Sequence, residues 1–273
     1  MNYRSIGART AVAVLSAIAV STTGHTVANA QDWRIAAQAE IDAYQSQHPT
    51  DYTGIDQLLT KYGLPPMQVR INGIDRDLTS SEAETVLASR EAAAKSAPSD
   101  FGVLAVPTDA FSVAMTLNYD LNTNRVVTGS WNFRDNYVNG SAPDDVATIQ
   151  TNLGGGGCFR TGTLTRKAAD YTGADHTGST YIDDGGVNGS PIFGIRDTVS
   201  GFKLLTDNGY FKATFNKTGA SGCSSAKLGA QFQFEHNQDG SGGFSASAGW
   251  GVFSISYSNG GSKLRKSTTA SYL

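Results

Sequence analysis

A histidine among carboxylates is the part of the sequence that comes nearest to a catalytic group. His176 lies in a polar stretch with Asp170 and Asp175, and Asp183 and Asp184 follow a few residues later. A histidine beside a carboxylate can act as a general base in hydrolysis. A solvated loop histidine has the same kind of neighbours, because loops are polar whether or not they act. A hydrolase that uses these residues is therefore one alternative for the function.

Other catalytic motifs are absent from the sequence. It contains no G-x-S-x-G elbow, no H-E-x-x-H pair and no phosphate-binding loop, and the glycine run at 154–157 has no accompanying lysine. No zinc-ligand spacing is present, so no metal site is predicted. The principal prediction is a non-enzymatic binding or structural module, and the question of an enzyme stays open.

Aromatic side chains in polar loops are candidates for contacting an extracellular ligand such as a carbohydrate or a protein. Tyr137, Tyr171 and Tyr181 have this setting. Trp131 and Trp250 instead share the apolar parity of their predicted strands, so we expect both in the core.

Calcium is an alternative at three loops rich in Asp and Asn. The loops span 135–139, 183–186 and 237–240. Calcium binds such oxygens, but Asn, Asp and Gly are also the ordinary turn residues, and no loop matches the EF-hand pattern. We therefore predict turns and no cofactor, and keep calcium as the alternative.

The two cysteines predict one disulfide. Cys158 and Cys223 both lie among glycines and serines, a composition typical of loops. An exported chain meets an oxidising environment, and only one pairing is possible. The bridge would close a loop of about 65 residues, which stabilises by roughly 4 kcal/mol in the chain-entropy model. A metal site or a free nucleophilic thiol is the alternative.

The first 30 residues have the pattern of a secretory signal peptide. Arg4 and Arg9 precede an apolar run over 10–20, and Ala28 and Ala30 form the small-residue cleavage pattern. The run is about half the roughly 20 residues that a membrane span needs. We therefore predict a secreted, extracellular protein, and no later segment is apolar for long enough to cross a membrane.

The charge of the mature chain argues against nucleic acid as a partner. Without the predicted signal peptide, 19 basic and 24 acidic residues remain, a formal charge of −5. Phosphate binding draws on clustered Lys and Arg. The one short basic cluster, Lys263, Arg265 and Lys266, is expected to be solvated or to protect a sheet edge.

Residues 31–100 predict a helical segment that is an appendage or a removable pro-segment. The first helix has an apolar face formed by Trp33, Ala37, Ile41 and Tyr44. A second helix is expected near 55–62, ending at Gly63. A capping-box spacing, Ser81 followed by Glu84, predicts the start of a third. The stretch 97–100 is a linker by composition.

Residues 101–273 predict an antiparallel β domain, a sandwich or a barrel-like fold. Apolar and polar residues alternate over 111–119, 127–133, 211–216 and 228–235, and Gly, Asn and Asp lie between these runs. Alternation with one polar face is typical of antiparallel rather than parallel sheets. Mainly β structure behind a short helical segment is therefore the predicted fold class.

The sequence from Lys227 to Tyr257 predicts a pair of strands joined by a glycine turn, and this pair allows one further function. Long alternating strands rich in Ser and Gly resemble the membrane-inserting hairpins of pore-forming proteins, and about 10 alternating residues suffice to cross a bilayer. An ordinary sandwich has the same alternation. The apolar parity shifts by one residue near Phe253, which predicts a β-bulge.

Overall fold

The computed structural model describes the following parts of the chain: 29–95, 106–134, 137, 144–153, 157–183, 189–196, 198–200, 203–238, 241–259 and 261–273. Nearly all of the predicted signal peptide, residues 1–30, lies outside them, so the signal peptide and secretion stay predictions. The same holds for the linker at 97–100. No helix among the described residues is both long and apolar enough to cross a membrane.

Two antiparallel sheets form the body of the protein, which confirms the predicted mainly β, sandwich-like fold. The first, here called the helix-side sheet, has the strand order β1-β2-β3-β10-β5. Its strands are β1 (Gln68–Ile71), β2 (Phe111–Tyr119), β3 (Arg125–Phe133), β10 (Asn208–Lys217) and β5 (Phe159–Ala169).

The second sheet, here called the hairpin-side sheet, has the order β14-β11-β4-β7-β6, and β15 also pairs with β11. Its strands are β14 (Ser262–Ser267), β11 (Gly229–Gln238), β4 (Asp145–Thr151), β7 (Ile192–Ile195), β6 (Thr180–Asp183) and β15 (Ser271–Tyr272). A short 3₁₀ helix, η1 (Thr177–Ser179), precedes β6, and β8 (Val199–Ser200) pairs with β9 (Lys203–Leu204).

Aromatic side chains fill the space between the two sheets. Trp131 is buried, as predicted, and its ring stacks on Phe211 with centroids 4.9 Å apart. Phe211 stacks in turn on Phe193 at 4.1 Å. A Cβ atom at Gly129 would lie 2.0 Å from the ring of Phe232, so glycine is what allows this ring its place. Each such buried side chain stabilises the fold by about 2–3 kcal/mol.

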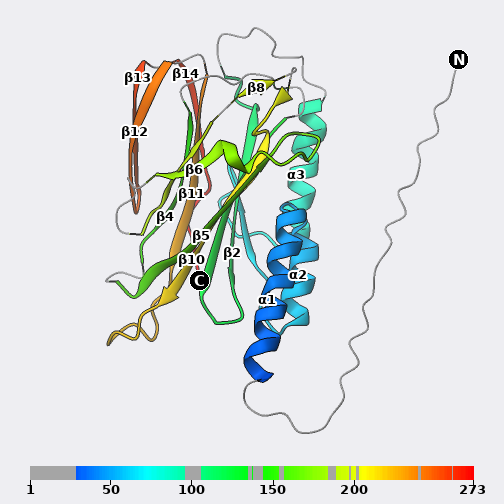
Figure 1. The fold of residues 1–273 in the computed structure, drawn as a ribbon, viewed down its shortest axis with the longest axis vertical. Helices are drawn as coiled ribbons and strands as arrows, with labels where there is room; N and C mark the ends of the chain where they lie inside the picture. The colour runs from blue at the N-terminus through cyan, green and yellow to red at the C-terminus, as the bar shows by residue number, and fades with distance from the viewer. Residues whose placement is uncertain are drawn as a thin grey trace, which may run out of the picture.

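Three helices cover the outer face of the helix-side sheet (Figure 1): α1 (Asn29–Gln47), α2 (Tyr52–Lys61) and α3 (Ser80–Lys95). Ala37 and Ile41 are buried as predicted, whereas Trp33 at the start of the face is 47% exposed, because α1 extends past the body it packs on. The segment also supplies β1, which pairs with β2 and was not predicted.

The capping box of α3 lies two residues earlier than predicted. The Thr79 backbone N–H donates to Glu82, and the Glu82 N–H donates to the Thr79 hydroxyl. Glu84 instead accepts from the N–H and the hydroxyl of Thr53 at the start of α2. The observed pair, Thr79 and Glu82, and the predicted pair, Ser81 and Glu84, both have the S/T-x-x-E spacing, so spacing alone did not distinguish them.

A separate two-stranded hairpin, β12 (Ser241–Gly249) and β13 (Val252–Asn259), lies on the outer face of the hairpin-side sheet, opposite the helices (Figure 1). Two predictions were wrong here. The parity shift comes from a turn at Trp250 and Gly251, where Gly251 has φ +73°, and not from a bulge. β11 does not pair with this hairpin, because it pairs with β4 and β14.

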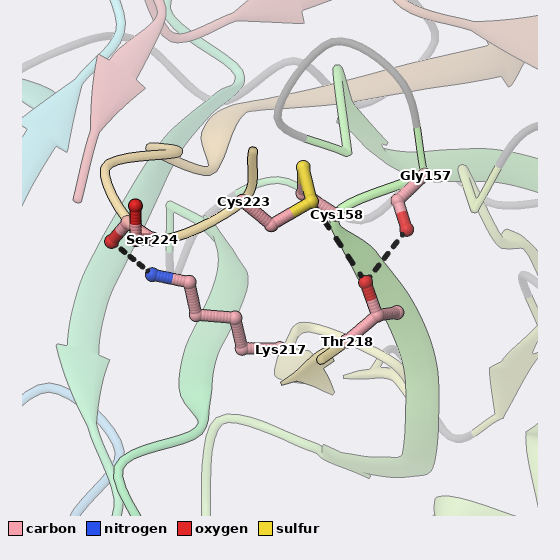
Figure 2. The surroundings of a disulfide bond; sticks show 6 residues. All are labelled: Gly157, Cys158, Lys217, Thr218, Cys223 and Ser224. Atoms are coloured by element: carbon pink, nitrogen blue, oxygen red, sulfur yellow. Dashed lines mark hydrogen bonds between the residues drawn. A yellow bond between two sulfur atoms is a disulfide. The ribbon is translucent and has the colours of Figure 1, made fainter. Parts of the chain in front are cut away.

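The disulfide between Cys158 and Cys223 is present, with Cα atoms 5.3 Å apart (Figure 2). Cys158 immediately precedes β5, and Cys223 lies in the loop after β10, whose last residue, Lys217, pairs with Phe159. The Thr218 hydroxyl donates to the Gly157 carbonyl beside the bridge. The disulfide therefore fastens a loop to the end of a strand pair.

Candidate functional site

A cavity of about 490 Å³ lies between α3 and the ends of β2, β3 and β14. Helix α3 contributes the small or apolar side chains of Leu87, Ala88 and Ala94 and the charged side chain of Glu91, which recur at one-, three- and four-residue steps. The opposite wall carries polar groups from the sheet side. Its lining there consists of Asn72, Thr108, Asp109, Phe111, Ser112, Asn132, Arg134 and Lys266.

Two cationic side chains of this cavity have no carboxylate partner among the described residues. Arg90 donates to the side-chain and backbone oxygens of Asn72, at 2.9 and 2.6 Å. Lys266 donates to the Phe111 carbonyl, and its ammonium lies 4.9 Å from the centroid of the Phe111 ring. Both side chains are thus hydrogen-bonded to neutral oxygens and not to carboxylates, and the charge of Asp109 acts on Lys266 only from a distance.

The remaining charges at the cavity are already engaged. Arg134 forms an ion pair with Asp109 at 2.8 Å, and its side chain is almost fully buried. Glu84 is held by Thr53 on the neighbouring helix. Three cationic side chains, Arg90, Arg134 and Lys266, and three anionic ones, Glu84, Glu91 and Asp109, line the cavity, so its formal charges balance. Among the described residues, Arg90 and Lys266 are the two of these cations that form no ion pair.

Burial and the charge of a neighbouring cation shift the pKa values in this pair. Burial, and then the positive charge of Arg90, lower the pKa of Lys266 from 10.5 to about 8. Burial also lowers the pKa of Arg90. A ligand with a negative group would relieve both penalties, because an opposite charge favours the charged form of each side chain.

Lys266 corrects the interpretation of the basic cluster near the end of the chain. Lys263 and Arg265 share one face of β14, where they contact the hairpin through Tyr257 and Phe253. Lys266 has the opposite parity and lines the cavity instead. Strand alternation was the signal that separates it from its neighbours.

Of the predicted catalytic residues, His176 and Asp170 lie near each other without a hydrogen bond between them. His176 Nε2 is 3.7 Å from Asp170 Oδ2, beyond hydrogen-bond length. Burial raises the pKa of Asp170, but hydrogen bonds from Thr172 and Ala174 outweigh burial and lower it to about 2. Asp170 is thus committed to its turn, and Asp175 likewise accepts from the Thr177 N–H.

The last two carboxylates of the catalytic hypothesis are not brought to His176 by any contact described. Asp183 pairs with Ile192 at the end of β6, and Asp184 lies outside the described residues. His176 does not line the cavity beneath α3. The hydrolase stays an untested prediction.

The three tyrosines predicted to contact a ligand have different surroundings. Tyr137 is fully buried, whereas Tyr171 is 51% exposed and lies below the ammonium of Lys203. Tyr181 is half-buried, and its hydroxyl donates to Asp144 at 2.7 Å. Tyr171 is the one of the three that is accessible as a stacking surface.

A buried polar cluster around His236 escaped prediction. His236 Nδ1 lies 2.9 Å from both carboxylate oxygens of Asp145, and Nε2 lies 2.6 Å from the hydroxyl of Tyr137. All three side chains are fully buried, and burial raises the pKa of Asp145 well above its usual range. His236 shares the parity of Phe232 and Phe234, which face the core, and strand alternation was the signal that could have placed it there.

The loops considered for calcium lie partly outside the described residues. Within the described part of the chain, no three His, Cys, Asp or Glu side chains form a group that could hold a metal ion. The calcium alternative therefore gains no support from the described geometry.

Comparison with known proteins gives no family. Neither a protein-family model nor a curated protein matches the chain. Among solved structures, the chain is similar to one titled "pH-induced modulation of Streptococcus parasanguinis adhesion by Fap1 fimbriae", with 10% identity and a TM-score of 0.25. The match covers 58% of this chain and 79% of that chain, and so low a similarity carries no argument about function.

Proposed function

We propose that the protein is a secreted, non-enzymatic binding module whose ligand is a small acid with an apolar body. One observation carries the proposal: Arg90 and Lys266 line the same cavity, and neither has a carboxylate partner among the described residues. Two neighbouring cations that are in no ion pair favour an anionic guest, although the carboxylates of the lining, Asp109 among them, reduce this effect.

The rest of the cavity indicates the shape of the guest. Its volume lies within the roughly 300–1,000 Å³ of ordinary ligand pockets. Leu87, Ala88, Ala93 and Ala94 on α3 and Phe111 on β2 provide apolar walls. An acid head between the cations and a hydrocarbon body along α3 would match both parts.

The disulfide supports the extracellular location in this proposal. Stable disulfides are typical of oxidising compartments and rare in the cytosol. Carbohydrate and protein ligands, which the sequence also suggested, gain no comparable feature here, because of the three candidate tyrosines only Tyr171 is exposed.

Calorimetric titration tests the proposal with dodecanoate and, separately, with inorganic phosphate. Dodecanoate should bind and dodecanol should not, because only the acid neutralises the two cations. Lys266→Gln should weaken dodecanoate binding by about tenfold or more, equivalent to one charge-assisted hydrogen bond. Lys263→Gln, the same change on the other face of β14, should bind like the wild type.

Two results would overturn the proposal. One is a wild-type protein that binds neither dodecanoate nor phosphate. The other is equal binding by the two lysine variants, which would place the acid elsewhere. Binding of phosphate alone would retain the anion site and exclude the apolar body.

A further inference from the structure

The β12–β13 hairpin is an insertion at the tip of a longer hairpin. β11 and β14 pair antiparallel up to Gln238 opposite Ser262. The chain between these two residues forms β12 and β13, which pair only with each other among the named strands. Instead of continuing outward from β11 and β14, this tip folds back onto the hairpin-side sheet.

The two hairpins share almost the same register. Partners in β11 and β14 have residue numbers that add up to 500, as in His236 with Leu264. Ser241 with Asn259 keeps this sum, and Phe244 with Tyr257 exceeds it by one, at a register shift. The four strands therefore match one continuous hairpin that has been bent between β11 and β12 and between β13 and β14.

The sequence is rich in glycine on both sides of the hairpin. The chain has Gly240, Gly242 and Gly243 on the way into β12, and Gly260 and Gly261 on the way out of β13. Glycine adopts backbone conformations that other residues resist, which lowers the cost of converting a bent chain into an extended one.

The hairpin has the two faces of a membrane barrel strand pair. Serines point outward to solvent: Ser245, Ser247, Ser254, Ser256 and Ser258. Apolar side chains point to the sheet: Phe244, Ala246, Ala248, Phe253, Ile255 and Tyr257. No charged residue occurs between Asp239 and Lys263. Strands of nine and eight residues approach the roughly 9–11 that span a bilayer.

The sheet face beneath the hairpin is polar, which is unusual for a buried surface. Thr148, Gln150, Glu235 and Asn237 are all buried there. Gln150 and Arg265 donate to backbone oxygens of β13, and the side-chain amide of Asn237 finds no partner among the described residues. Val146 and Ile192 are the sheet's apolar contribution to the cluster beneath the hairpin.

Because the sheet face beneath the hairpin is polar, the hairpin can detach from it with little loss of stability in the sandwich. Water would satisfy the uncovered amides and carboxylates, and the aromatic core between the two sheets would stay covered. The cost falls instead on the apolar face of the hairpin, which needs a new apolar environment. Trp250 and Val252 at its tip are already 37% and 60% exposed.

We propose that the β12–β13 hairpin swings out to extend β11 and β14 and inserts into a lipid bilayer. Backbone groups within a bilayer must all be paired, so one hairpin cannot insert alone and several copies must close a barrel. The apolar face would then contact lipid and the serine face would line a water-filled lumen. This activity is separate from acid binding beneath α3.

Dye release from vesicles of phosphatidylcholine and phosphatidylglycerol tests the proposal with the full mature chain. The wild type should release trapped dye. Ile255→Asp places a charge on the lipid face and should slow release by more than about tenfold. Ser256→Asp makes the same addition one residue further, on the lumen face, and should release dye like the wild type.

A second variant keeps the test valid if Ile255→Asp misfolds. Val146→Cys with Ala248→Cys joins the hairpin to the sheet across the cluster that these residues share. The oxidised form should release no dye, and a reductant should restore release. The wild type with the same reductant is the control, because it contains the Cys158–Cys223 bridge.

Three outcomes would overturn the proposal. These are a wild type that releases no dye, equal release by the Ile255 and Ser256 variants when both are folded, and undiminished release by the oxidised double-cysteine variant. Release by the wild type without membrane-bound oligomers on cross-linking would also overturn it, because a single hairpin cannot form the lumen.

Discussion

Lys263 and Lys266 lie three residues apart on β14 and have opposite surroundings. The ammonium of Lys263 lies over the exposed side of Tyr257, while Lys266 is largely buried beside Arg90 and Phe111. Neighbouring residues of a strand lie on alternate faces, so two lysines three residues apart face opposite sides of β14, and only Lys266 faces the cavity. A shift of β14 by one residue would exchange the two faces and remove this lysine from the site.

Acid binding should weaken in alkaline solution through Lys266. Its pKa of about 8 lies below the ordinary 10.5, so the ammonium loses its charge as the pH rises through about 8. Affinity for dodecanoate, measured by calorimetry, should be constant between about pH 6 and 7, where the acid is ionised, and fall by up to about tenfold per pH unit above 8. Lys266→Arg keeps its charge, and its profile should stay flat. A falling profile in that variant would assign the titration to another group.

The buried cluster at His236 should matter for stability rather than for binding. His236→Ala removes one partner each from the carboxylate of Asp145, which keeps the Asn237 N–H, and from the hydroxyl of Tyr137, which keeps Gln238, at a cost of about 3 kcal/mol in this buried setting. Urea unfolding measures this loss. His48→Ala, at an exposed position, is the matched control and should change little. Equal losses would show that the cluster contributes nothing specific.

At the scale of elements, the strands were more predictable than the helix ends. Strand alternation depends on burial of one face, and this worked for β2, β3, β10 and β11 because each has one face in the aromatic core. The capping box had two candidates with identical spacing, and the choice depends on where α2 lies. The prediction that Trp250 lies in the core was wrong for a similar reason. Its parity fitted a core strand, but a turn places it at the tip of the β12–β13 hairpin.

The site itself was not predictable from local patterns. Arg90, Asn72, Phe111 and Lys266 come from three distant parts of the chain, and only the packing of α3 and β14 against the end of β2 brings them together. The catalytic hypothesis used residues close in sequence, which is what a single sequence offers. Asp145 and His236 are 91 residues apart and could not be paired in that way.

The start of α3 gives a direct test at this scale. Thr79→Ala removes the observed cap and should lower the free energy of unfolding by about 1 kcal/mol. Ser81→Ala, at the cap position predicted from the sequence, should change it by only a few tenths. Thermal or urea unfolding of both variants decides between the two positions, and the reverse order would favour the earlier prediction.

At the scale of the whole molecule, the contacts between the helical layer and the sheet beneath it determine whether the β domain can fold without residues 31–100. Within the described residues, the cluster beneath the helices receives only Ala114 and Leu121 from the β domain, and the rest comes from 31–95. The sheet beneath α1 is polar there, since Thr128 and Lys212 bond to Gln45 and Asp42. These few apolar contacts are the reason to expect a division at residue 100, which stays a prediction.

A fragment of residues 101–273 should therefore fold alone, with reduced stability because β2 loses its partner β1. Circular dichroism and the heteronuclear NMR spectrum of the fragment measure this, and its disulfide should form. The boundaries 31–100 and 101–273 would be abandoned if the fragment were soluble only in denaturant.

The disulfide should stabilise the molecule as a whole. Joining positions 65 residues apart restricts the unfolded chain by roughly 4 kcal/mol. Replacing both cysteines by serine should lower the urea midpoint accordingly without altering the folded spectrum. A loss below about 1 kcal/mol would mean that the loop is already restrained in the unfolded state.

The strand order has a consequence for the timing of synthesis. β11 lies between β4 and β14, and β2, made more than a hundred residues earlier, has its Phe111 carbonyl bound by Lys266 of β14. One edge of β11 therefore stays unpaired while residues 262–272 are still inside the ribosome. Pairings this distant form slowly. Until its last strands emerge, the growing chain would be incompletely folded. An incompletely folded polypeptide is what can pass through a narrow export channel.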